Sequence, residues 1–124
     1  MRITCHSPLV QRRTPERSAF TLTARFFDDS TDTWSASTPS TADYRIDRIR
    51  VGEPSCYETV RDWTTLTPAT SNSIAITASD NAITCEDLRD QQMQVTVRAN
   101  AGLSTQFQAT YRYAVTNLAG QVAA

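Results

Sequence analysis

The stretch QMQVTVRANAGLSTQFQATYRYAV, residues 92–115, contains two runs in which apolar and polar side chains alternate. A period of two places every second side chain on the same face of a β-strand. In the first run, one face carries Met93, Val95, Val97 and Ala99. In the second run, one face carries Leu103, Phe107, Tyr111, Tyr113 and Val115, and the other carries Gln106, Gln108 and Arg112. The pattern predicts two strands that each bury one face.

The two runs are joined by Asn100, Ala101 and Gly102. A three-residue connection that ends in glycine favours a β-hairpin, because glycine accepts the left-handed conformation of a G1 bulge. The sequence therefore predicts an antiparallel hairpin with strands over 92–99 and 103–115.

Other strands follow from the same periodicity. Residues 19–27, AFTLTARFF, place Phe20, Leu22, Ala24 and Phe26 on one face. Residues 73–77, SIAIT, pair Ile74 with Ile76. Weaker strands are expected at 2–5, near Tyr57–Val60 and around Trp63–Leu66.

Residues 43–51, DYRIDRIRV, begin with the same alternation but change phase partway. Their apolar positions are Tyr44 and Ile46, and then Ile49 and Val51. One extra residue in an alternating strand is typical of a bulge. The sequence therefore predicts a bulge or bend near Asp47-Arg48.

The strand pattern predicts the fold class. About seven short strands at roughly 10-residue spacing indicate an all-β protein, an immunoglobulin-like antiparallel β-sandwich. A chain of 124 residues suits one domain over 1–124. The one helical candidate is residues 80–91, DNAITCEDLRDQ, but Ile83 and Leu88 give it a poor apolar face. We expect a long ordered loop or a single turn there.

Composition excludes several classes of partner. The net charge is −1, whereas binding to nucleic acid or to an anionic membrane calls for a basic surplus. No apolar run approaches the roughly 20 residues of a membrane span. The first residues lack the apolar region of a signal peptide. We expect no nucleic acid and no membrane as partners, and synthesis in the cytoplasm.

The basic residues and the distribution of charge point to interfaces. All 12 basic residues are arginine, which is enriched at protein interfaces where lysine is depleted. Residues 1–62 hold 18 charged side chains and residues 63–124 hold seven. A neutral polar surface costs little to desolvate and suits a permanent interface. The alternative is an ordinary sheet with a threonine-rich face toward solvent.

No residue pattern indicates catalysis or a cofactor. The single histidine, His6, lies in a predicted loop without a partner nucleophile. The cysteines Cys5, Cys56 and Cys85 are widely spaced, which favours three small buried side chains over one disulfide. A zinc site from these cysteines and His6 lacks the usual close ligand pairs. The carboxylates at 28–32 and 86–90 are interpreted as solvated turn residues, although calcium binding at 28–32 remains an alternative.

The two tryptophans have different surroundings. Trp63, in the run Asp62-Trp63-Thr64, is expected to fill the core between the sheets. Trp34 lies in a stretch rich in Ser, Thr and Asp. It is either an exposed interface anchor, since tryptophan is a favoured hot spot, or a side chain packed back on its own domain.

Several segments within residues 43–118 form a recognisable set. They are DWTTLTPATSNSIAIT (62–77), DNAI (80–83), QVTV (94–97), GLSTQ (102–106) and the stretch from Tyr111 to Leu118. Together they resemble small β-sandwich structural proteins of tailed bacteriophages, encoded among head and tail genes. The resemblance implies a part of the virion, present in multiple symmetric copies, with other tail, neck, portal or capsid proteins as partners.

The expected function is that of a neck, tail or fibre-to-tail adaptor without enzymatic activity. A capsid decoration protein on the phage head is the first alternative, and a carbohydrate-binding or adhesin-like module is the second. The expected binding surfaces are sheet edges, outward arginines and the loops at 28–42 and 78–91. The candidate interface residues are Trp34, Arg98, Gln106, Gln108 and Arg112.

Overall fold

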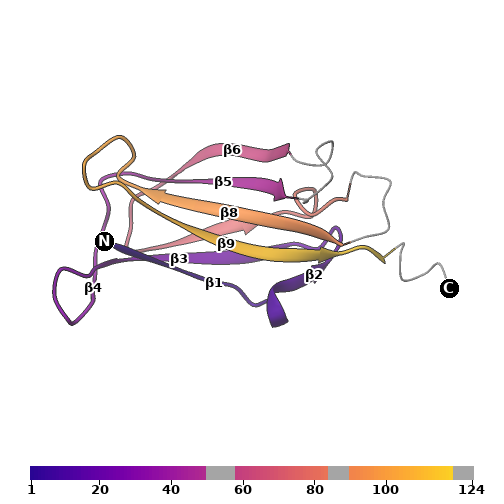
Figure 1. The fold of residues 1–124 in the computed structure, drawn as a ribbon, viewed down its shortest axis with the longest axis horizontal. Helices are drawn as coiled ribbons and strands as arrows, with labels where there is room; N and C mark the ends of the chain where they lie inside the picture. The colour runs from indigo at the N-terminus through magenta and orange to yellow at the C-terminus, as the bar shows by residue number, and fades with distance from the viewer. Residues whose placement is uncertain (50–57, 84–89, 119–124) are drawn as a thin grey trace.

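A computed structural model describes residues 1–49, 58–83 and 90–118 of the chain. In this part of the protein, two β-sheets pack against each other, and their strands run along the long axis of the molecule (Figure 1). Besides these strands, the described residues include a short 3-10 helical segment, η1 (Val10–Arg12). The prediction of an all-β sandwich is confirmed. No helix among the described residues is long and apolar enough to cross a membrane.

The smaller sheet is built around one long strand, β3 (Phe20–Asp28). On one side β3 pairs with β1 (Arg2–His6). On the other side it pairs with β7 (Ser71–Ile76) and, at its end, with the short β4 (Ser35–Ala36). All three pairings are antiparallel.

The larger sheet has five strands in the order β2-β9-β8-β5-β6. They are β2 (Arg13–Pro15), β9 (Phe107–Thr116), β8 (Gln91–Ala99), β5 (Ala42–Ile49) and β6 (Glu58–Leu66). The weak strands expected near 57–60 and 63–66 are thus one continuous strand, with Tyr57 outside the described residues.

The segment between β1 and β2 carries the chain from the smaller sheet to the larger one. In η1, Gln11 and Arg12 adopt φ angles of 55° and 52°, in the left-handed region that is uncommon for residues with a Cβ. After this turn β2 runs parallel to β9, with Thr14 opposite Val115. The described residues form nine strands where about seven were expected, and this one pair is parallel in an otherwise antiparallel sandwich.

The predicted inner faces form the core. The buried apolar side chains from the smaller sheet are Ile3, Phe20, Leu22, Ala24, Phe26, Ile74 and Ile76, and those from the larger sheet include Tyr44, Ile46, Met93, Val95, Val97, Ala99, Tyr111, Tyr113 and Val115. Across the two sheets, the rings of Phe20 and Tyr113 meet edge to face with centroids 5.0 Å apart. The two-residue periodicity therefore identified most of the core correctly.

The hairpin between β8 and β9 is confirmed, but its loop is longer than predicted. Pairing ends at Ala99 opposite Phe107. Within the loop, Asn100 O accepts from Leu103 N at 3.1 Å, and Leu103 O accepts from Gln106 N at 3.0 Å. These two turns keep the chain out of the sheet until Phe107. Leu103 is 52% exposed, so its predicted place on the apolar face is wrong.

The predicted change of phase in β5 does not occur in its described part. An irregularity does occur close to the predicted position, but in the pairing with β6, whose register shifts between Ile46 and Asp47. β5 pairs with β8 without a shift from Ala42 to Ile49. As a result Arg48 points inward, where it is 5% exposed and donates from Nη2 to Ala82 O at 3.1 Å. Val51, and residues 84–89 of the predicted loop or turn, lie outside the described residues.

Candidate functional site

The larger sheet has one face that points away from the smaller sheet, and we call it the outer face. Over β5, β8 and β9 the strands pair without a shift, so outer side chains form cross-strand rows. The rows are Asp43–Arg98–Gln108, Arg45–Thr96–Thr110 and Asp47–Gln94–Arg112. These positions alternate with the apolar core positions, and the outer face is therefore polar throughout these rows.

Two neighbours hold Arg98 in place on the outer face. Its guanidinium pairs with Asp43 through two bonds, with Nε 3.0 Å from Oδ1 and Nη2 2.5 Å from Oδ2. The guanidinium carbon lies 3.8 Å from the centroid of the Trp63 ring. The hydrogen bond to Asp43 raises the pKa of Arg98, which keeps the cation fully charged. A guanidinium that is both paired and stacked loses little further freedom when a partner binds.

Trp63 lies on this face and not in the core, so the prediction that it fills the space between the sheets is wrong. It is partly buried on β6 and does not belong to the hydrophobic core cluster. The reason is its spacing from Leu66, which is buried and pairs with Ala42. Side chains three positions apart on a strand point to opposite faces. That spacing is the sequence signal that places Trp63 outside.

The remaining rows of the outer face are also internally bonded. Arg45 Nε donates to Asp47 Oδ1 at 3.0 Å, and Thr59 Oγ1 donates to the same oxygen at 3.0 Å. Further along, Arg112 Nε donates to Gln94 Oε1 at 2.8 Å. The charged side chains of these rows, together with Gln94, are therefore oriented by bonds to their neighbours before any partner arrives.

The five candidate interface residues do not form one surface. Arg98, Gln108 and Arg112 share the outer face. Gln106 lies in the loop between β8 and β9, where its Oε1 accepts from Gly102 N at 2.9 Å. Trp34 lies just before β4, on the smaller sheet.

Trp34, Phe27 and Arg2 form a second exposed feature, which we call the Trp34 corner. The ring centroids of Phe27 and Trp34 are 6.0 Å apart, and the Arg2 guanidinium lies 4.8 Å from the Trp34 ring centroid. Trp34 is nevertheless 48% exposed. The ring is thus packed partly on its own domain and partly accessible, which combines both interpretations of the sequence.

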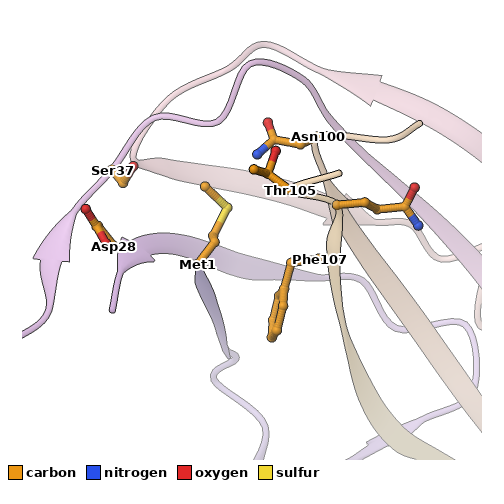
Figure 2. Close-up of a pocket in the computed structure, with 7 residues that line it drawn as sticks. Met1, Asp28, Ser37, Asn100, Thr105 and Phe107 are labelled. Carbon is orange, nitrogen blue, oxygen red and sulfur yellow. The ribbon is translucent and has the colours of Figure 1, made fainter. Parts of the chain in front are cut away.

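A cavity of about 410 Å³ opens between the N-terminus and the loop that follows β8 (Figure 2). Its apolar lining comes from Met1 and Phe107. Its polar lining comes from Asp28, Ser37, Asn100, Thr105 and Gln106. In Figure 1 the N-terminus, the loop before β4 and the loop after β8 gather at the same end of the sandwich. The cavity and the Trp34 corner therefore lie at one end of the sandwich, the same end as the Asp43–Arg98–Gln108 row of the outer face.

A buried polar cluster joins the two sheets at their other end. Asn81 is completely buried; its Oδ1 accepts from the Tyr113 hydroxyl and its Nδ2 donates to Ser18 O, each at 2.6 Å. Burial, together with the charge of Asp80, raises the pKa of Tyr113 well above its usual range. The phenol therefore remains a hydrogen-bond donor at all ordinary pH values.

Arg61 and Asp80 extend this cluster. Asp80 is 5% exposed, accepts from Thr77 N at 2.8 Å and pairs with Arg61. Arg61 Nη1 also donates to the Tyr44 hydroxyl at 2.6 Å. Burial alone lowers the pKa of Arg61. The hydrogen bond that Arg61 donates to Tyr44 and the charge of Asp80 outweigh the effect of burial, and the pKa is raised. Sequence reasoning missed the cluster, because its polar members carry no periodic signal.

Cys5 is the one cysteine within the described residues, and it is a free thiol. Cys56 and Cys85 lie outside the described residues, so the zinc set that the sequence disfavours and any disulfide between these two cysteines fall there as well. In the ranges 1–49, 58–83 and 90–118, no three His, Cys, Asp or Glu side chains come together as a metal site requires.

We expect Cys5 to alkylate slowly in the folded protein. Burial, only partly offset by the charge of Arg12, raises its pKa from 9.0 to about 11. At pH 8 the thiolate fraction should be about 100-fold lower than in the unfolded chain, because each pKa unit is a factor of ten. Iodoacetamide labelling followed by peptide mass spectrometry, in native buffer and in urea, measures the ratio. Equal rates in the two conditions would contradict the buried thiol.

No protein-family model, curated protein or solved structure matches the chain. The surfaces described above must therefore be interpreted from their own geometry and from the sequence pattern.

Proposed function

We propose that this protein is a bacteriophage virion structural protein, a neck, tail or fibre-to-tail adaptor that acts in multiple symmetric copies and catalyses no reaction. The proposal joins the resemblance of its segments to phage head and tail proteins with the properties of the outer face. The observation that carries it is the ordered group of Arg98, Asp43 and Trp63.

The outer face has the chemistry of a stable protein interface. Arginine and tryptophan are the residue types that most often dominate binding energy. Here Arg98 and Trp63 contact each other and are oriented by the pair with Asp43. Gln94, Gln108 and Thr110 add neutral polar groups, which are cheaper to desolvate than charges. A partner would thus meet a preordered surface with little conformational entropy to lose.

The edge strand β6 is poorly suited to pairing with a strand of a partner, which favours the outer face as the docking surface. β6 pairs with β5 through two register shifts, and such irregularities weaken further strand addition. Beside it, Arg61 Nη1 donates to Ala75 O of β7 at 3.3 Å, so a side chain already occupies a backbone acceptor at the neighbouring edge. We therefore place the contact on the outer face.

We also infer an immunoglobulin-like arrangement of the strands. In such sandwiches one sheet contains strands G, F and C in that order, and the other contains B and E. The neighbours β9, β8 and β5 correspond to the first set, and β3 with β7 correspond to the second. In variable-type domains, an additional strand beside C extends the same sheet, as β6 does here.

Mass spectrometry of purified particles tests the proposal. We expect peptides of this chain in intact virions at a fixed ratio to the other structural proteins. Separating heads from tails before digestion distinguishes the adaptor from the alternative, a decoration protein on the capsid. Absence of the chain from intact particles would end the virion assignment in both forms.

A further inference from the structure

The cavity between the N-terminus and the loop after β8 has properties that the outer face lacks. It is concave, and its volume of about 410 Å³ lies within the range of small-molecule sites. Figure 2 shows Met1 between Asp28 on one side and Thr105 and Phe107 on the other. The site therefore combines an apolar wall with polar groups that come from several parts of the chain.

Asn100 supplies a fixed donor in this cavity. The residue is 7% exposed, and its Oδ1 accepts from Ser40 N at 2.8 Å. Its backbone N donates to Thr41 O at 2.9 Å. The side-chain amide is thus locked in orientation, and Nδ2 makes no hydrogen bond to the described residues. A donor held in a fixed direction loses little freedom when a ligand accepts from it.

Asp28 supplies the complementary acceptor. Its Oδ1 accepts from Ser30 N at 2.9 Å. This backbone bond, more than any other cause, lowers the pKa of Asp28, so the carboxylate is ionised at neutral pH. Ser37 and Thr105 add hydroxyl groups, and none of the described residues that line the cavity is an arginine.

We propose that this cavity binds a neutral saccharide, in the form of a single hexopyranose ring. Sugar hydroxyls both donate and accept, which matches the Asp28 carboxylate and the Asn100 amide nitrogen. The C–H groups of the ring match the apolar wall of Met1 and Phe107. The N-terminal ammonium of Met1 is already paired with Asp29 at 2.9 Å, so it is not free to bind an anion, and an ammonium ligand would face the Asn100 donor. The site goes beyond the proposed virion role and is separate from the outer face.

Amide-resolved NMR of the 15N-labelled protein tests this site. The probes are the methyl glycosides of glucose, galactose, mannose and N-acetylglucosamine. We expect at least one to give saturable shifts at Asn100, Thr105 and Gln106, with a Kd of about 1 mM for so small a ligand. The matching trisaccharides separate two sources of the sugar. A Kd lower by tenfold indicates the end of a longer glycan, and an equal Kd indicates a free monosaccharide.

Three variants complete the experiment. Asp28→Asn should weaken binding by about tenfold, because it removes a charge-assisted hydrogen bond, and Thr105→Arg should abolish binding by filling the cavity. Asp32→Asn is the matched control, since it removes an exposed carboxylate from the loop that follows Asp28, and Asp32 is not among the described residues that line the cavity. The proposal is overturned if no glycoside shifts these amides, or if Asp32→Asn weakens binding as much as Asp28→Asn. Arg98→Ala should leave sugar binding unchanged, which keeps this test independent of the virion role.

Discussion

Asn81→Ala should lower the free energy of unfolding by about 3 kcal/mol. Asn81 is completely buried between the Tyr113 hydroxyl and Ser18 O, with both bonds at 2.6 Å. The alanine variant leaves a buried donor and a buried acceptor without partners, and each costs about 1–3 kcal/mol. Urea unfolding measures the loss as a lower midpoint at an unchanged slope.

A double-mutant cycle with Tyr113→Phe separates this effect from loss of packing. The phenylalanine variant alone should cost about 1 kcal/mol, because it removes one hydrogen bond and keeps the ring. Once the Tyr113 hydroxyl is removed, Asn81→Ala leaves one fewer polar group without a partner. The double variant should therefore lose less stability than the sum of the losses of the two single variants. Strictly additive costs would contradict the Asn81–Tyr113 bond.

Asn72→Ala is the matched control for the same cycle. The Nδ2 of Asn72 is buried in β7 and makes no hydrogen bond within the described residues. Its removal should therefore cost far less than that of Asn81, or even stabilise the protein.

Arg98→Ala should reduce incorporation into virions by at least about tenfold, if the outer face is the docking surface, because truncating a central arginine typically costs a few kcal/mol of binding. The side chains of Arg98 and Asp43 remain 22% and 18% exposed, so the loss of the pair should change folding stability only modestly. The measurement is quantitative mass spectrometry of particles from a complemented deletion strain, with the thermal transition of the isolated variant as the folding check.

Arg25→Ala is the control for this experiment. Arg25 is an exposed arginine on β3 of the smaller sheet, opposite Thr4 and Ser71 in register. It should enter particles at the normal ratio. Arg112→Ala, at the far row of the outer face, should give an intermediate loss. Equal incorporation of all three variants would move the interface away from the outer face.

The core was predictable because it depends on one repeating property of the sequence. Alternation places Leu22, Phe26 and Val95 inward wherever a strand is paired on both sides, and those positions are buried. The predicted slip in β5 failed for the same reason. Continuous pairing with β8 holds the phase of the strand even where the sequence puts Arg48 on the inner face, and its bond to Ala82 O compensates for burial.

The candidate site was predictable only in part. The outward direction of Arg98 and Arg112 followed from alternation, but their partners Asp43 and Gln94 belong to strands distant in sequence. The cavity depends on loops that were recognised only in part: the turn at Asn100 was predicted, but the second turn, at Leu103, was not. Such contacts are set by tertiary packing, and a single sequence carries no periodic mark of them.

The crossing of the first segment between the sheets has a mechanical consequence. β1, the first strand of the chain, pairs with β3. β2 follows it and lies parallel to β9, the last strand. Figure 1 places the start of β1 and the end of β9 at opposite ends of the sandwich. Tension between Arg2 and Asn117 would therefore run along the strands and load the β2–β9 hydrogen bonds in shear, all at once instead of one after another. A domain tied in this way resists pulling along its length, which suits a joint that must transmit force.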